Sequence, residues 1–578
     1  MIMFHSAHCR FAAVVAMLAI PPVLTAQSVV HDSGVVASRR GLVVSASGLA
    51  SDAGASILRR GGNAVDAAVA TAFARAVTYP AAGNIGGGGF MIVRPARGAP
   101  VAIDYRERAP LGATATMYLD AAGRVNGALT DSGYLAPGVP GTVHGLATAH
   151  RRFGRLPWHE VVMPAVLLAE RGFVLSADLA EELNGQLSRT MGRFPASVAA
   201  YGKPGRARWQ QGDTIVLRDL GRTLRAIATD GPNAFYRGWI ADSIAADMRR
   251  HGGLITNRDL AAYRAKVRTP VTGRFLGYDV VSMPPPSSGG VAMIEMLNIL
   301  EALHVESRPR YSARTLHLLI ESARRAYLDR ARHLGDPDFV RVPVARLTSK
   351  AHARALALTI DTARASSSAA LGQDVLATAV RGESEHTTHF SVVDAEGNAV
   401  SNTFTLEDGY GSSVVVRGAG FLLNNEMGDF NKQPGVTTAG GQIGTPANVI
   451  VPGKRMLSSM TPTIVTKNGQ LFFITGSPGG RTIINTVTQM VLNATAFRMD
   501  VRAAVDAPRL HHQWMPDETT LEQNAVPESV LAELRAMGHA VRMRGGQGDA
   551  HSIVYDAATR AAFGANDPRS ADSKASVP

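Results

Sequence analysis

The chain has 578 residues, of which 46% are hydrophobic and 18% are charged, and this balance excludes an intrinsically disordered chain. Its formal net charge of +12 comes from scattered arginines among only 6% aromatic residues, which argues against a nucleic-acid-binding protein. The single cysteine, Cys9, lies close to the N-terminus, so disulfides and a cysteine nucleophile are excluded from the rest of the chain.

Residues 1–26 have the pattern of a secretory signal peptide. Arg10 precedes a short apolar run from Phe11 to Ile20, and Leu24-Thr25-Ala26 is an acceptable cleavage site. The run is too short to span a bilayer, which needs about 20 apolar residues. We therefore expect a periplasmic or secreted protein with no transmembrane segment in its mature form. A retained N-terminal anchor is the alternative.

The first half of the chain alternates helical and strand patterns. The expected elements are a helical segment over 49–76 broken by a Gly-Gly-Asn turn at 61–63, strands over 90–94 and 101–105, and a mainly helical region over 145–265. Clustered glycines at 83–89 predict a tight loop that feeds the first strand, in a backbone suited to a substrate loop.

The second half changes character after two long helices. A proline-rich turn at 284–290 precedes helices over 291–303 and 314–332, and residues 361–385, with weak periodicity, are expected to form a mobile connection. The remainder is richer in strand patterns and contains a helix over 483–496. This mixture predicts an α+β fold of stacked sheets covered by helices.

One expected hairpin brings two threonines together. Strands over 388–393 and 399–406 flank the turn cluster Asp394-Ala395-Glu396-Gly397-Asn398. If the loop has five residues, Val393 faces Ala399, and the same register places Thr387 opposite Thr405 with Cβ atoms about 4.5–5.5 Å apart. A four-residue loop would break this pairing.

This placement has a chemical use. A threonine hydroxyl needs a nearby base to become a nucleophile, and backbone cleavage before Thr387 would free its own α-amino group. Such an amine has a pKa of about 7.7–8.0 and can accept a proton near neutral pH. The pattern alone favours an ordinary strand that begins with β-branched residues.

The motifs around the hairpin resemble a known family. Thr387-Thr388-His389-Phe390-Ser391, Gly397-Asn398-Ala399-Val400, Thr403-Phe404-Thr405-Leu406-Glu407 and Tyr410-Gly411 are similar to the γ-glutamyltransferase (γ-glutamyltranspeptidase) signature. Matching segments continue in order along nearly the whole chain after residue 26, including 62–68, 83–91, 104–107, 138–143, 422–430, 457–460, 476–480 and 567–570.

The resemblance implies a four-layer αββα sandwich of the N-terminal-nucleophile hydrolase type. It implies a precursor that cuts itself between His386 and Thr387 into a large subunit, 27–386, and a small subunit, 387–578, which remain together as a heterodimer. The expected reaction transfers the γ-glutamyl group of glutathione or a similar compound to water or to an amino acid or peptide acceptor. An ester on Thr387 is the intermediate, and no cofactor is expected.

The resemblance also assigns roles to individual residues. Thr405 is expected to hydrogen-bond to the nucleophile Thr387, and the backbone N–H groups of Gly479 and Gly480 to form an oxyanion hole, as donors near a helix start can. The substrate zwitterion would be held by one cation with two hydroxyls and by three carboxylates, namely Arg106 with Ser458 and Ser459, and Asp429 with Glu407 and Glu426. Taken singly, each carboxylate is equally typical of a solvated surface charge.

Two positions depart from the family pattern, and two alternative functions stay open. Glu407 stands where asparagine is frequent, and Gly440, within a lid-like loop over 434–451, replaces a tyrosine of some bacterial members, which suggests a more open pocket. His511 and His512 lack partners at ligand spacing, so we expect no catalytic metal. The alternatives are a glutaryl-type β-lactam acylase of the same family and a non-catalytic secreted binding protein.

Overall fold

A computed structural model describes residue 1, residues 34–375 and residues 387–578 of the chain. Its strands are β1 Val36–Ser38, β2 Gly41–Ser45, β3 Gly88–Arg94, β4 Val101–Asp104, β5 Phe173–Val174, β6 Thr214–Ile215, β7 Lys266–Arg268, β8 Val271–Phe275, β9 Tyr278–Ser282, β10 Thr388–Asp394, β11 Ala399–Thr405, β12 Thr463–Lys467, β13 Gln470–Thr475, β14 Leu510–His511, β15 Thr519–Glu522, β16 Val541–Arg544, β17 Ser552–Asp556, β18 Ala561–Ala565 and β19 Lys574–Ser576.

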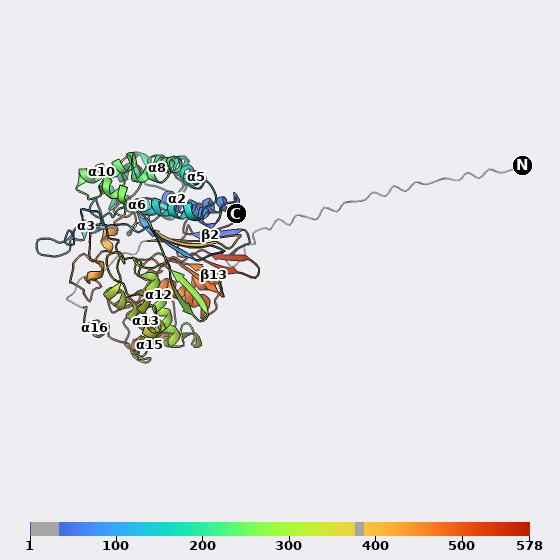
Figure 1. Cartoon of the computed structure of the whole chain (residues 1–578), viewed down its shortest axis with the longest axis vertical. Helices are drawn as coiled ribbons and strands as arrows, with labels where there is room; N and C mark the ends of the chain where they lie inside the picture. The colour runs from blue at the N-terminus through green and yellow to red at the C-terminus, as the bar shows by residue number, and fades with distance from the viewer. Residues whose placement is uncertain (2–33, 376–386) are drawn as a thin grey trace.

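Two seven-stranded antiparallel sheets form the centre of the molecule (Figure 1). One has the order β19-β2-β10-β11-β3-β4-β7 and contains the predicted hairpin, and the other has the order β1-β18-β17-β13-β12-β9-β8. The C-terminal strand β19 pairs with β2, so residues 574–576 and 43–45 are neighbours in one sheet.

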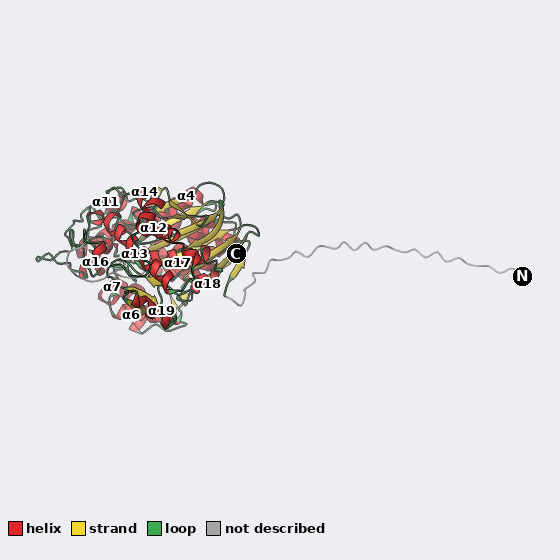
Figure 2. Ribbon diagram, turned by 90° about the horizontal axis from the view of Figure 1, so that it is seen from below, coloured by secondary structure: helices red, strands yellow, loops and turns green. Residues whose placement is uncertain are grey.

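Helices cover the outer face of each sheet. Over the hairpin sheet and its surroundings lie α1 Gly48–Arg59, α2 Ala64–Thr78, α3 Ala128–Asp131, α4 Thr142–Phe153, α5 Trp158–Arg171, α6 Ala177–Ser188, α7 Pro195–Tyr201, α8 Arg218–Asp230, α9 Asn233–Tyr236, α10 Trp239–His251 and α11 Asn257–Ala262. The second helical layer, seen from below in Figure 2, comprises α12 Gly289–Ala302, α13 Ala313–His333, α14 Val344–Leu347, α15 Lys350–Ala357, α16 Ser368–Leu371, α17 Thr482–Thr495, α18 Val501–Asp506 and α19 Glu528–Ala536.

Strand alternation divides the interior into two cores. Met91 and Val93 of β3 pack with α1 and α2, whereas Phe90 and Ile92 face the second sheet. Successive side chains of a strand point to opposite faces, so β3 contributes side chains to both cores. The resulting order of helices, sheet, sheet and helices confirms the αββα sandwich.

Most expected elements appear within a few residues of their predicted bounds, but the connection over 361–385 differs. The Ala365 N–H donates to the Met537 carbonyl at 2.8 Å, the Ser366 N–H donates to Glu321 at 3.1 Å, and the Trp514 indole donates to the Ser368 carbonyl at 2.8 Å. The prediction of a mobile connection is therefore wrong for 361–375, because its polar groups find partners that composition does not reveal. Residues 376–385, like the expected signal peptide and His386, lie outside the described residues.

Within the described part of the chain, no helix is both long and apolar enough to cross a bilayer.

The glycine-rich loop before β3 supports the hairpin rather than opening toward a substrate. A Cβ atom added to Gly87 would lie 2.2 Å from the Thr405 carbonyl oxygen, and one added to Gly86 would lie 2.1 Å from the Leu422 carbonyl oxygen. Asn84 donates from its side chain to the Thr405 carbonyl at 2.8 Å. Glycine is required here for close backbone approach to the end of β11.

Replacing Gly87 by alanine should destabilise the protein by about 1–3 kcal/mol, the usual cost of overpacking, because the new methyl group meets backbone that cannot move freely. The matched control is Gly545→Ala, where an added Cβ has no heavy atom within 4 Å. Thermal unfolding measures both. Equal melting temperatures for the two variants would contradict the tight approach of this loop to Thr405.

Candidate active site

One small cavity gathers most of the residues selected from the sequence. Its walls include every predicted binding residue together with three of the predicted catalytic ones, namely Arg106, Thr387, Thr405, Glu407, Glu426, Asp429, Ser458, Ser459 and Gly480. These residues come from eight separate places in the chain, so their convergence is a property of the fold. The free space is only about 30 Å³, since the side chains themselves fill most of the cavity.

The hairpin has the predicted register. Val393 pairs with Ala399 and Thr388 pairs with Phe404, as a five-residue loop requires. Asp394 shapes that loop, because its carboxylate accepts hydrogen bonds from the backbone of Glu396 and Asn398 at 2.9 and 3.0 Å. One further step along the ladder places Thr387, immediately before β10, beside Thr405, the last residue of β11.

Thr387 and Thr405 are buried but still reach the cavity. Thr387 is 8% exposed and Thr405 is 3% exposed. The Thr405 hydroxyl accepts a hydrogen bond from the Glu407 N–H at 2.8 Å, which fixes its side chain at the end of the strand. A hydroxyl oriented in this way is suited to positioning a neighbouring nucleophile.

The glycine pair lies in a turn between β13 and α17, as predicted. Gly479 and Gly480 both have positive φ, 125° and 54°, which glycine adopts without strain. Gly480 lines the cavity, and the Gly479 carbonyl accepts from the Thr482 N–H at 3.0 Å as α17 begins. Because the first N–H groups of a helix lack intrahelical acceptors, this turn provides donors for a developing negative charge.

Arg106 is the buried cation of the cavity and follows β4. Its N–H donates to the Asp104 carboxylate at 3.0 Å, and its carbonyl accepts from the Tyr263 hydroxyl at 2.8 Å. Its guanidinium forms ion pairs with Glu426, at 2.6 Å, and with Asp429. Burial opposes the charge, but these two carboxylates outweigh burial and raise the pKa of Arg106 above its ordinary value.

The two poles of the expected substrate clamp therefore contact each other in this structure. A substrate carboxylate would take the place of these anions at Arg106, and a substrate ammonium would take the place of the guanidinium at the anions. The exchange conserves charge, which suits the binding of a zwitterion at a buried site.

The carboxylates differ in electrostatic environment. Burial and the charges of Asp429, Asp408 and Glu426 raise the pKa of Glu407 well above its usual range. Burial also raises the pKa of Glu426, although Arg106 opposes the shift. So many acidic groups around one guanidinium cannot all be ionised.

Ser458 and Ser459 are held by the opposite wall. Backbone bonds join Ser458 to the proline-rich turn, whose Ser288 N–H donates to the Ser458 carbonyl at 2.7 Å. The Ser459 hydroxyl accepts a hydrogen bond from Arg330 at 3.2 Å. The turn at 284–290 thus positions these two hydroxyls at the cavity.

Two charged residues next to this site, Glu107 and Arg481, are not among the site residues predicted from the sequence. Glu107 is fully buried, with a carboxylate oxygen 3.7 Å from the Arg106 guanidinium, and burial raises its pKa to about 8 despite that cation. Arg481 lines the cavity and donates to the Gly441 carbonyl of the lid-like loop at 2.9 Å. Glu107 directly follows Arg106, and Arg481 directly follows Gly480, which are both predicted site residues. This adjacency is the only feature of the sequence that indicates a place for Glu107 and Arg481 in the site.

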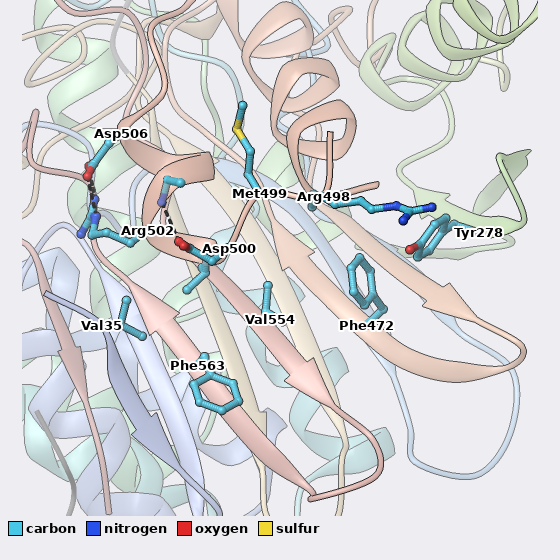
Figure 3. A pocket seen from close by; sticks show the side chains of 13 residues that line it. Val35, Tyr278, Phe472, Arg498, Met499, Asp500, Arg502, Asp506, Val554 and Phe563 are labelled. Atoms are coloured by element: carbon cyan, nitrogen blue, oxygen red, sulfur yellow. Dashed lines mark hydrogen bonds and ion pairs between the residues drawn. The ribbon is translucent and has the colours of Figure 1, made fainter. Parts of the chain in front are cut away.

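The paired histidines have structural contacts. Asn485 lies 2.7 Å from His511 Nδ1, and His512 Nδ1 lies 3.0 Å from the Glu518 carbonyl. A second, larger cavity of about 690 Å³, shown in Figure 3, is lined largely by apolar groups such as Phe472, Val554 and Phe563. It shares no lining residue with the cavity around Thr387.

The chain is similar to known proteins in both sequence and fold. Residues 50–577 match the family model described as gamma-glutamyltranspeptidase. A glutathione hydrolase proenzyme of Escherichia coli (strain K12) is 45% identical, with 93% of this chain and 92% of that protein covered. A gamma-glutamyltranspeptidase structure from Helicobacter pylori is 44% identical with a TM-score of 0.53, covering 54% of this chain and 90% of that one. A cephalosporin acylase structure from Bacillus halodurans has a TM-score of 0.80 at 26% identity, covering 96% and 99% of the two chains.

The raised pKa of Glu407 predicts a pH-dependent stability difference. A carboxyl whose pKa is higher in the folded state contributes stability that is lost as the pH rises above its unfolded pKa of about 4.3. The side chain of the Glu407→Gln variant is neutral at every pH. The melting temperature of this variant minus that of the wild type should therefore increase from pH 5 to pH 8. Glu528→Gln, at an exposed carboxyl, serves as the control. A Glu407→Gln difference that is constant over this range would contradict the assignment.

Proposed function

The chain belongs to the γ-glutamyltranspeptidase family, and from that premise we propose that it cleaves itself before Thr387 and then transfers γ-glutamyl groups through an ester on this residue. The activity is that of a γ-glutamyltransferase or glutathione hydrolase made as a proenzyme. The observation that carries the residue assignment is the convergence of Thr387, Thr405 and Gly480 with Arg106 and its carboxylate partners in one cavity.

Cleavage would turn the start of β10 into a catalytic centre. The freed α-amino group of Thr387 accepts the proton of its own hydroxyl, and the oxygen attacks the γ-carbonyl of the substrate. Backbone N–H groups of Gly479 and Gly480 stabilise the resulting oxyanion. Collapse of this intermediate expels the amine, which takes up the proton, and leaves the γ-glutamyl ester.

The second half of the reaction repeats these steps with a new nucleophile. Water or the amine of an amino acid or peptide attacks the ester, and Thr387 leaves with the proton that its α-amino group returns. Thr405 holds the Thr387 hydroxyl in place through both halves, in line with its own fixed orientation by the Glu407 N–H.

Substrate recognition would rest on the charges around Arg106. The guanidinium, with Ser458 and Ser459, receives the α-carboxylate, and Asp429 with Glu407 and Glu426 receives the α-ammonium. A glutaryl group lacks that ammonium, so it would leave three carboxylates facing an apolar methylene. The carboxylates thus favour a γ-glutamyl substrate over the glutaryl substrate of an acylase, and glutathione is the expected donor.

The remaining assignments follow from the cleavage position. Residues 27–386 would form the large subunit and 387–578 the small one. The two halves contribute neighbouring strands to both central sheets, with β10 and β11 of the small subunit between β2 and β3 of the large one. A heterodimer with such a shared sheet remains associated after the cut. The N-terminal pattern supports export to the periplasm or beyond, with residues 1–26 removed.

Replacing Thr387 by alanine should leave the purified protein as one full-length chain, because the hydroxyl that starts the cleavage is absent. Thr387→Ser keeps a hydroxyl and should still mature, though more slowly. Denaturing electrophoresis after incubation distinguishes the two outcomes. Two fragments from Thr387→Ala would remove Thr387 from the cleavage step.

Replacing Arg106 by alanine should reduce kcat/KM for a γ-glutamyl anilide by about 10- to 100-fold, the range expected for lost charge-assisted hydrogen bonds. Arg106→Lys keeps the charge without the bidentate geometry, so its kcat/KM should lie between those of the wild type and Arg106→Ala. Only matured two-chain enzyme is assayed, so that a failure of cleavage is not mistaken for weak binding. Glutaryl anilide, which lacks the ammonium, is the matched substrate control, and a preference for it would favour the acylase.

A further inference from the structure

A cluster of metal-binding side chains lies in the second helical layer, outside the active site. Glu295 comes from α12, Asp329 and His333 from α13, and His352 from α15, three helices drawn together in Figure 1. His352 Nε2 lies 2.8 Å from Asp329 Oδ2 and 4.0 Å from Glu295 Oε1. His333 Nε2 lies 4.0 Å from the other Asp329 oxygen.

Helix geometry brings these groups to one point. Asp329 and His333 are four residues apart on α13 and therefore share one face. The helix α12 packs against both α13 and α15, so the three helices lie next to one another. The ligand atoms of Glu295, Asp329 and His352 all lie within 4.8 Å of one another.

The spacing fits a small divalent ion. A tetrahedral zinc ion with bonds of about 2.0–2.1 Å holds its ligand atoms about 3.4 Å apart, between the two distances that separate His352 from its acidic neighbours. An ion in place of the proton shared by His352 and Asp329 would lengthen their 2.8 Å separation and shorten the 4.0 Å separation from Glu295 by about 0.6 Å each.

Glu295 provides independent support for a missing cation. Its side chain is 1% exposed, and its Oε1 atom has no hydrogen-bond partner among the described residues. A buried carboxylate oxygen without a partner is costly, so native structures retain one where another group completes its environment. The nearby guanidinium of Arg332 lies 3.5 Å from Asp329 but is held mainly by Asp374 at 2.6 Å.

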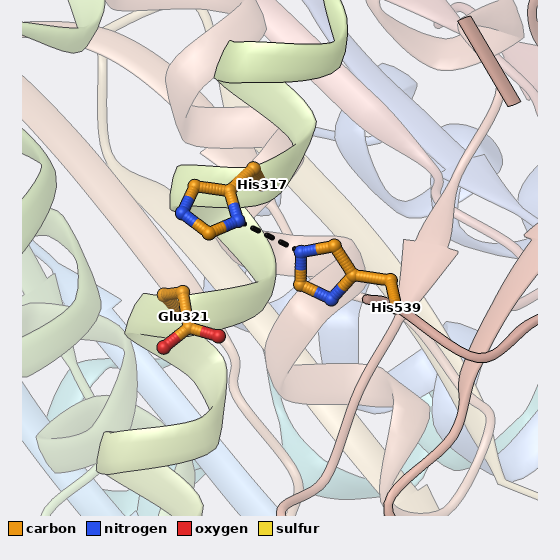
Figure 4. A group of neighbouring side chains, drawn as sticks. All are labelled: His317, Glu321 and His539. Atoms are coloured by element: carbon orange, nitrogen blue, oxygen red, sulfur yellow. Dashed lines mark hydrogen bonds between the residues drawn. The ribbon is translucent and has the colours of Figure 1, made fainter. Parts of the chain in front are cut away.

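A second cluster with a similar composition is less suited to a cation. His317, Glu321 and His539 also lie close together, as Figure 4 shows, with His317 Nδ1 and His539 Nε2 only 2.8 Å apart in a hydrogen bond. Glu321 is already paired with two guanidiniums, those of Arg324 at 3.2 Å and Arg325 at 2.7 Å. A further positive charge would be repelled there.

We propose that Glu295, Asp329 and His352 bind one divalent transition-metal ion of the zinc type. Two carboxylates and an imidazole nitrogen favour zinc, cobalt or manganese over calcium, which prefers oxygen ligands alone. His352 is 15% exposed and His333 is 33% exposed, so the ion has a route from solvent. The ion would tie α12, α13 and α15 together and would take no part in catalysis.

The test is zinc titration of the matured protein after chelator treatment and dialysis, measured by calorimetry. We expect one zinc ion per molecule and a higher melting temperature in its presence. His352→Ala should weaken zinc binding by at least about tenfold. His304→Ala removes an exposed imidazole next to a single carboxylate, Glu306 at 3.5 Å, and should bind as the wild type does.

Glu295→Gln is the second variant, because it retains the side-chain shape and guards against loss of folding in His352→Ala. It should also bind zinc at least about tenfold more weakly. Titration with cobalt should give visible absorption bands in the wild type that are lost in both variants. No zinc binding by the wild type, or equal binding by the wild type and both variants, would overturn the proposal. Since the readout is binding, it stands apart from the γ-glutamyl activity.

Discussion

The antiparallel pairing of β10 with β11 is the constraint on which the site depends. A one-residue slip would move every side chain of β10 to the opposite face and would separate Thr387 from Thr405. The register is held from several directions, by the Asp394 loop, by β2 and β3 on either side, and by the glycine loop that closes on the Thr405 carbonyl. The nucleophile position is therefore fixed by backbone geometry before any chemistry occurs.

The buried charges around Arg106 are the second constraint on the site. Arg106 is buried among Glu107, Glu426 and Asp429, with Glu407 close by, so its guanidinium is paired with carboxylates of the same chain. A ligand must offer both a carboxylate and an ammonium to replace these pairs without leaving a buried charge unpaired. In the proposed function, this requirement is the physical basis for selecting an α-amino acid head group over an acyl group with only one of the two charges.

The sequence predicted the hairpin well because its evidence is local. Turn residues at 394–398 and strand alternation determine the register, and the helix after Gly480 follows from its apolar periodicity. The contacts of Arg106 with Glu426 and Asp429 could not be derived that way, since more than 300 residues separate them and only the fold brings them together. The roles of these residues entered through family resemblance.

Other features of the structure could not be predicted from the sequence for the same reason. The packing of 361–375 depends on Glu321, Trp514 and Met537, which lie on distant elements. The composition of the glycine loop indicates that its backbone approaches another group closely. It does not identify that group as the Thr405 carbonyl rather than a substrate. The Glu295 cluster requires three helices to be packed before its members meet, so no motif in the sequence indicates it.

The most direct test of the central claim is the intact mass of both chains after purified precursor has matured. We expect a small chain that begins at Thr387. A small chain beginning at any other residue, or a precursor that stays whole while γ-glutamyl transfer proceeds, would contradict the assignment of Thr387 as the N-terminal nucleophile.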